Sequence, residues 1–131
     1  MKPQMNTDEH RINSMTEKVI GCSYKVANAL GCGFLEKVYE NALAHELRRA
    51  GVSVEQQKPI QVQYDGIVVG EYVADLLAGG CVLVELKTVK QFDEIHMAQC
   101  LNYLRATGLK ICLLINFGVP KLQIKRVING C

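Results

Sequence analysis

The sequence has 131 residues, enough for one domain with a sizeable hydrophobic core. Its formal net charge is +2 and 49% of its residues are hydrophobic, so the composition is that of an ordinary globular protein and does not by itself indicate nucleic-acid binding. The N-terminus lacks the apolar core of a signal peptide, and no apolar run is long enough to span a membrane. We therefore expect a single domain over residues 1–131, with residues 1–7 as a disordered tail.

The six cysteines form no C-x-x-C pair and are scattered among apolar positions. This pattern argues against a zinc site or a disulfide framework. It favours reduced core thiols in a cytoplasmic protein.

Two helices are predicted in the N-terminal part. Asn6 or Thr7 can cap the first, whose apolar residues recur every three or four positions: Ile12, Met15, Val19, Cys22, Val26 and Leu30. Glycines at 31 and 33 end this helix. The second is expected over about 34–50, with an inward stripe of six residues: Leu35, Val38, Tyr39, Ala42, Leu43 and Leu47.

Glu36 lies at the edge of that stripe and has two interpretations. It is either a partly exposed residue whose stem covers the core, or an acidic group directed at a functional site. The helix alone favours the first interpretation.

The remaining elements are mostly strands. A short strand is predicted at 52–56, a second at 60–64, and a turn at Asp65-Gly66 leads into a third at 67–77. A helix follows over about 92–106, closed by Gly108, then a buried central strand at 110–117 and an edge strand near 122–127. This order predicts a mixed α/β sheet flanked by helices.

The segment from Val73 to Val89 contains the strongest functional signal. It predicts two apolar strands joined by a turn at glycines 79 and 80, which places Asp75 opposite Glu85 with Lys87 on the same face. Two buried carboxylates without a partner are costly, and a divalent metal ion suits them best. The alternative, a buried ion pair of Lys87 with one carboxylate, leaves the second carboxylate uncompensated.

The third helix carries three polar residues on one face, His96, Gln99 and Tyr103. They form either a solvated polar stripe or a helix face that lies next to the Asp75 and Glu85 site. His96 is the weaker functional candidate, because a surface histidine is the commoner case.

Several motifs together resemble a known nuclease superfamily. Asp75 followed by Glu85-Leu86-Lys87 resembles the D…(D/E)-x-K core of PD-(D/E)XK nucleases, with Ala74 in place of the usual proline. Residues 99–103 match the Q-x-x-x-Y motif of RecB-like members. Residues 33–39 match G-x-x-E-x-x-Y, which names a family of small bacterial proteins in the same superfamily, the GxxExxY proteins. The resemblance covers nearly the whole chain and implies a restriction-endonuclease-like mixed sheet flanked by helices.

The resemblance also implies roles for these residues. Mg²⁺ or Mn²⁺ would be held by Asp75, Glu85 and the backbone carbonyl of Leu86, with waters completing an octahedron. Lys87 would orient the attacking water or stabilise the transition state. Two further roles follow: Glu36 would hold a second metal or a metal-bound water, and the side chains that would bind the phosphate or brace Lys87 are Gln99 and Tyr103.

The function expected from the sequence is a metal-dependent nuclease acting on DNA or RNA. The candidate phosphate-binding cations, Lys90, Lys121 and Lys125, form no dense run, so affinity for nucleic acid would be weak unless a homodimer or a partner protein contributes. Two alternatives stay open: a non-catalytic binding module that keeps the fold, and an oligomeric scaffold whose last strands form an interface.

Overall fold

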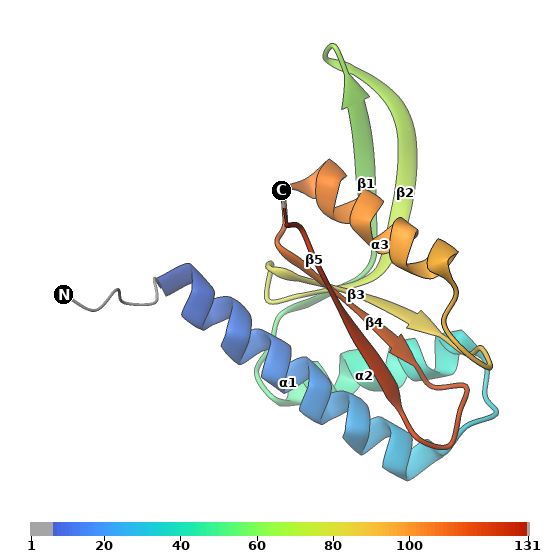
Figure 1. The fold of residues 1–131 in the computed structure, drawn as a ribbon. Coiled ribbons are helices and arrows are strands. Elements are labelled where there is room, and N and C mark those ends of the chain that lie inside the picture. Colours follow the sequence, from blue (N-terminus) through green and yellow to red (C-terminus); the bar gives the residue numbers. More distant parts are fainter. Residues whose placement is uncertain (1–6, 131) are drawn as a thin grey trace.

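The computed structural model describes residues 7–130 and contains a five-stranded mixed sheet with helices on both faces (Figure 1). The predicted mixed sheet flanked by helices is therefore confirmed. The elements in chain order are α1 Thr7–Leu30, α2 Glu36–Arg49, β1 Val54–Tyr64, β2 Ile67–Ala78, β3 Val82–Lys87, α3 Glu94–Thr107, β4 Ile111–Asn116 and β5 Gln123–Ile128. Of the expected tail over residues 1–7, only Thr7 falls within the described residues, and it is the first residue of α1.

The strands lie in the order β1-β2-β3-β4-β5. All neighbouring pairs are antiparallel except β3 and β4, which are parallel. A parallel pair needs a crossover connection, and α3 provides it. All six residues of β4 are buried, as are all residues of β3 except Lys87, so these two strands form the interior of the sheet.

One face of the sheet is covered by α1 and α2. The predicted apolar stripe of α1 is confirmed, because Val19 and Val26 are buried in this core and the other stripe residues pack against it. Arg11 also donates a hydrogen bond to the carbonyl of Gly79 at 2.6 Å, which ties α1 to the turn between β2 and β3. The opposite face is covered by α3, where Cys100, Tyr103 and Leu104 are buried.

The buried face of α2 differs from the prediction. Leu35 precedes the helix and is 79% exposed, and Val38 is 38% exposed. The buried residues are instead Tyr39, Glu40, Leu43, Ala44 and Leu47. The helix begins two residues later than expected, and its inward stripe includes Glu40, an acidic residue that the apolar pattern passed over.

The two short strands predicted at 52–56 and 60–64 are one continuous strand, β1. Pro59 does not interrupt it and pairs with Val73. Because β1 is an edge strand, the missing N–H of a proline there can face away from the ladder.

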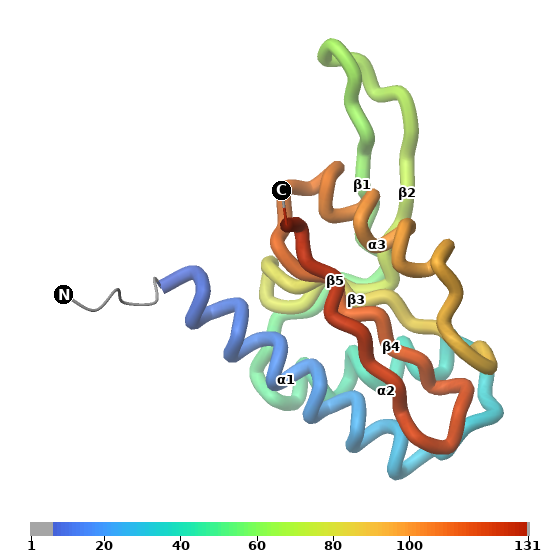
Figure 2. Tube along the Cα trace, in the orientation of Figure 1, coloured from blue at the N-terminus to red at the C-terminus, as the bar shows by residue number. Residues whose placement is uncertain are grey.

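The β1–β2 hairpin extends beyond the rest of the sheet as a projecting arm (Figures 1 and 2). Its outer part is apolar yet exposed, with Tyr64 at 70%, Ile67 at 65% and Val69 at 59% exposure. The part of the hairpin over residues 61–73, named the hairpin arm, therefore contributes mainly surface, whereas Ile60 at its base is buried in the core.

The cysteine interpretation holds only in part. Cys81, Cys100 and Cys112 are buried free thiols, but Cys32 is exposed and so is not a core thiol. Cys131 lies outside the described residues. No helix within residues 7–130 is both long and apolar enough to cross a membrane.

Candidate active site

The strands β2 and β3 separate at the point where the two predicted carboxylates stand. Their ladder ends at the pair Leu76 and Val84, so Asp75 and Glu85 are the next opposed positions. Here side chains replace ladder carbonyls as acceptors: the Asp75 N–H donates to Glu85 Oε1 at 2.8 Å, and the Leu86 N–H donates to Asp75 Oδ2 at 2.8 Å. We name this point of separation between β2 and β3 the fork. Both carboxylates lie in the fork, and each accepts a hydrogen bond from a backbone amide of the opposite strand.

Burial strongly disfavours charge on this pair. Glu85 is only 3% exposed. Its pKa is raised from the usual 4.5 to about 8, first by burial and then by the charge of Asp75, against the lowering effects of the Asp75 amide and of Lys87. The pKa of Asp75 is raised too, mainly by burial. A cation between the two groups would relieve both effects.

Lys87 does not neutralise the pair directly. Its charge lowers the pKa of both carboxyls, so it lies near them. Within residues 7–130, however, none of the ion pairs closer than 4.0 Å includes Lys87. The alternative of a buried Lys87–carboxylate ion pair is therefore wrong.

Glu36 approaches the same site from α2. It is the first residue of that helix, and its Oε2 accepts a hydrogen bond from the Thr88 N–H at 3.3 Å. Its charge raises the pKa of both Asp75 and Glu85. Glu36 is exposed, but its side chain reaches the segment directly after Lys87, as its interpretation as a site residue requires.

Glu40 is a buried acidic residue near the site that the sequence analysis missed. It lies one turn after Glu36, is 3% exposed, and raises the pKa of Asp75. Its carboxylate accepts hydrogen bonds from Gln57 at 2.7 Å, from Gln56 at 2.8 Å and from Lys37 at 3.0 Å. The available signal was the spacing, since residues four apart share a helix face.

The backbone of β1 is irregular beside Asp75. Gln56 pairs with Leu76 and Lys58 with Ala74, but Gln57 between them has a φ of 55°. A positive φ is uncommon for a residue other than glycine. The bond from Gln57 to Glu40 accompanies this conformation. Asp75 therefore has interrupted strand pairing on both sides.

A buried tyrosine, Tyr39, holds the loop that leads into α2 and Glu36. The Tyr39 hydroxyl donates to the Gly31 carbonyl at 2.6 Å and accepts from the Phe34 N–H at 3.2 Å. Its ring stacks on Phe117, with centroids 4.7 Å apart. These contacts fix the loop that precedes α2, so Tyr39 determines where Glu36 begins the helix.

The segment after Lys87 is held by the last residue of β4 and the two residues that follow it. The Asn116 side chain accepts from the Val89 N–H at 3.1 Å and donates to the Val89 carbonyl at 2.8 Å. The Phe117 N–H donates to the Lys87 carbonyl at 2.9 Å. A Cβ on Gly118 would lie 2.6 Å from the backbone of residues 88 and 89, so only glycine fits there.

The three polar residues of α3 have different environments. His96 belongs to a capping box with Asp93, its Nδ1 accepting from the Asp93 N–H at 3.0 Å. Tyr103 is buried, donates to the Val73 carbonyl at 3.2 Å, and has its pKa raised by burial and then by the charges of Glu85 and Asp75. Gln99 is half-buried and lines a depression with Lys87.

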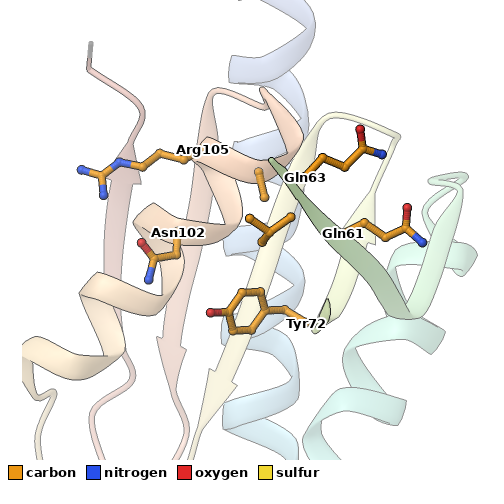
Figure 3. Close-up of a pocket in the computed structure, with 7 residues that line it drawn as sticks. Gln61, Gln63, Tyr72, Asn102 and Arg105 are labelled. Carbon is orange, nitrogen blue, oxygen red and sulfur yellow. The ribbon is translucent and has the colours of Figure 1, made fainter. Parts of the chain in front are cut away.

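Two depressions lie between α3 and the hairpin arm. The inner one, of about 410 Å³, is lined by Lys87 and Gln99 among others, and the outer one, of about 650 Å³, lies farther along the arm (Figure 3). Both are lined by Tyr72 and Asn102. Asp75 and Glu85 line neither, so Lys87 is the link between the depressions and the fork.

The described residues contain no cluster of three or more His, Cys, Asp or Glu side chains arranged to hold a metal. The side-chain donors at the fork are the two carboxylates, and the remaining ligands of an ion would be backbone and water oxygens. The predicted phosphate contacts Lys90, Lys121 and Lys125 are all exposed, the first in the segment after Lys87 and the others near β5.

This geometry can be compared with known proteins. Residues 13–127 match the family model of the PD-(D/E)XK nuclease superfamily. The chain belongs to this superfamily. Nucleases of this superfamily generally use divalent metal ions and act on nucleic acids.

Two solved structures are similar in fold. An alkaline exonuclease from Laribacter hongkongensis has a TM-score of 0.53 at 16% sequence identity, with 96% of this chain and 73% of that chain covered. The protein SSO0001 has a TM-score of 0.55 at 14% identity, with 92% of this chain and 61% of that chain covered. At such identities the likeness concerns the fold alone. A search of curated proteins found no match.

Proposed function

We propose that this superfamily member is a metal-dependent nuclease of the GxxExxY group that hydrolyses phosphodiester bonds of DNA or RNA. The observation that carries the proposal is the fork between β2 and β3. There Asp75 and Glu85 are brought together by reciprocal backbone hydrogen bonds, and burial makes their joint ionisation costly without a cation.

The donor set suits a hard divalent cation. In each carboxylate one oxygen is engaged by a backbone amide, which leaves Asp75 Oδ1 and Glu85 Oε2 without a hydrogen bond within the described chain. These oxygens and the Leu86 carbonyl are the ligand type that Mg²⁺ and Mn²⁺ prefer. The chemistry such an ion supplies when bound is a water of lowered pKa and a polarised phosphate.

The other residues act around this centre. Lys87 is near the carboxylates without an ion pair, so its ammonium is available to the attacking water or to the charge that develops on the phosphate. Glu36, at the start of α2, would orient a water or a second ion. Gln99 lines the same depression as Lys87 and would contact the phosphate. Tyr103 would brace β2 next to Asp75 through its hydrogen bond to the Val73 carbonyl.

The test is cleavage of labelled DNA and RNA by the purified protein with Mn²⁺, and with EDTA as the metal-free reaction. We expect Lys87→Ala to lower the rate about 10²–10³-fold, the size of effect seen when one transition-state contact is removed. We expect Glu85→Gln to abolish cleavage. Matched controls on the exposed face of α1, Lys18→Ala and Glu17→Gln, should cleave like the wild type. Cleavage that survives both site variants would refute the assignment.

A second candidate is a non-catalytic binding module that retains the fold. Two observations favour it: both carboxylates already accept backbone hydrogen bonds, and the described residues hold no three-residue metal cluster. Calorimetry separates the two candidates. Absence of Mg²⁺ and Mn²⁺ binding to the wild type would leave the carboxylates a structural role in the fork.

A further inference from the structure

The two depressions beside α3 form one groove. Tyr72 and Asn102 line both of them, so the inner and outer depressions are neighbours, and the two are together named the groove. The inner end reaches Lys87 and Gln99, and the outer end runs along the hairpin arm to Gln63 and Arg105. The groove therefore leads from the candidate active site to the projecting end of the molecule.

The outer depression is lined by both apolar and polar residues (Figure 3). Val62, Ala106 and Tyr72 are among the residues that line the outer depression, and Asn102 and Arg105 lie on its helix side. The two glutamines of β1, Gln61 and Gln63, lie on the hairpin side, and their side chains point away from the Tyr72 ring (Figure 3). The groove therefore offers an aromatic surface on the hairpin side and two polar side chains, Asn102 and Arg105, on the helix side.

Its charge is suited to an anion. The basic residues that line the two depressions are Lys87, His96 and Arg105, and no carboxylate lines either one in the described part of the chain. Arg105 is exposed, and among residues 7–130 it has no ion-pair partner within 4.0 Å. A cation with no carboxylate in its groove is the pattern expected for phosphate binding.

Tyr72 distinguishes a single strand from a duplex. Tyr72 is 42% exposed. Its ring contacts that of Tyr103 on one side, with the ring centroids 5.7 Å apart. An exposed ring can stack on a base only when that base is unpaired and unstacked. A duplex keeps its base faces inside the stack and could not use this surface.

We propose that the groove between α3 and the hairpin arm binds a single nucleic-acid strand, with a base stacked on Tyr72 and a phosphate held by Arg105. The inference rests on the proposed function in one respect: the bound strand would run toward Lys87, the candidate catalytic residue. Binding itself needs no cleavage. Asn102, which lines both depressions, offers the strand a neutral hydrogen-bonding group.

The experiment measures anisotropy of a labelled oligothymidylate strand in EDTA, with a hairpin duplex of the same length as competitor. We expect Tyr72→Leu to weaken strand binding roughly tenfold, the size of one lost base stack, and Tyr72→Phe to bind like the wild type. Arg105→Gln should weaken binding several-fold and reduce its salt dependence. The duplex should compete poorly.

Matched controls lie on other faces. Tyr24 on α1 is 45% exposed, a fraction similar to the 42% of Tyr72. Arg126 on β5 is exposed and lines neither depression. Tyr24→Leu and Arg126→Gln should bind as the wild type does. Wild-type binding by Tyr72→Leu and Arg105→Gln, or equal losses in the controls, would overturn the groove proposal, as would better binding of the duplex.

The outcomes also separate this proposal from the nuclease proposal. If the groove variants lose strand binding while no protein cleaves with Mn²⁺, the groove stands and the nuclease assignment fails. If the wild type cleaves and the groove variants still bind the strand normally, the nuclease assignment stands and the groove proposal is wrong. Thermal unfolding of each variant checks that it is folded. Because Tyr72 and Arg105 are both exposed, we expect their variants to unfold at nearly the wild-type temperature.

Discussion

The sheet has two halves that meet at Asp75 and differ in almost every respect. On one side β3 and β4 are buried on both faces and paired in full register. On the other side the hairpin arm is a two-stranded ribbon with exposed apolar residues on its outer part. The comparison teaches that the buried core and the exposed arm belong to different halves, and that the carboxylates stand at the boundary between them.

The boundary is where ladder bonds are lost. Side chains of Asp75 and Glu85 take over backbone bonds on one side, and Gln57 leaves the regular conformation on the other. Interrupted pairing costs stability, but it also frees carboxylate oxygens at a defined place. Strain or irregular backbone at a functional site is a common arrangement.

The largest expected difference between the halves is in their response to truncation. Leu113 in β4 is fully buried, so Leu113→Ala should lower the free energy of unfolding by about 2–5 kcal/mol. Val69 on the arm is 59% exposed, and Val69→Ala should change it by less than about 0.5 kcal/mol. Urea unfolding measures both. Similar losses at the two positions would contradict the division.

A pH dependence is expected from the boundary itself. Because the pKa of Glu85 is raised from 4.5 to about 8, the metal-free folded protein keeps a proton that the unfolded chain has released in this interval. Stability of the metal-free protein should therefore fall as pH rises from about 4.5 to about 8, by at most about 1.4 kcal/mol per pH unit for this group.

Urea titrations in EDTA across this range measure the slope. Glu85→Gln should flatten it, whereas Glu17→Gln on α1 should not. A metal-free wild type whose stability rises over the same interval would show that the carboxylates are not destabilised by burial.

A smaller effect is expected at Glu40, which joins α2 to β1 at the boundary. Glu40→Ala leaves the amides of Gln56 and Gln57 without their carboxylate partner, and should cost about 1–3 kcal/mol. The neighbouring exposed residue Asn41 also contacts Gln56, and Asn41→Ala should cost less. Thermal unfolding of the two variants gives the comparison. Equal losses would mean that Glu40 contributes only one ordinary surface contact.

Much of the boundary was predictable because strand geometry is strict. Two glycines at a turn and a period of two residues set the register, so the opposition of Asp75 and Glu85 followed from the sequence. The stripe of α1 followed in the same way from a period of 3.6 residues. In both cases the pattern is local, and tertiary contacts only reinforce it.

What the sequence did not predict depends on contacts between distant elements. Glu40 is buried because glutamines from β1 reach it, and its burial changes the face that α2 presents. Pro59 is tolerated inside β1 because that strand is at the edge. The role of Gly118 follows from backbone that lies about thirty residues earlier in the chain. Apart from the four-residue spacing of Glu36 and Glu40, these contacts leave no periodic pattern in the sequence.

The account depends most on the claim that Asp75 and Glu85 hold one divalent cation together. A crystal of the protein soaked in Mn²⁺, with data collected for anomalous scattering, tests it directly. We predict one anomalous peak within coordination distance of a carboxylate oxygen of each residue, and its loss in Asp75→Asn. A wild-type crystal with no peak between these two carboxylates would contradict the account.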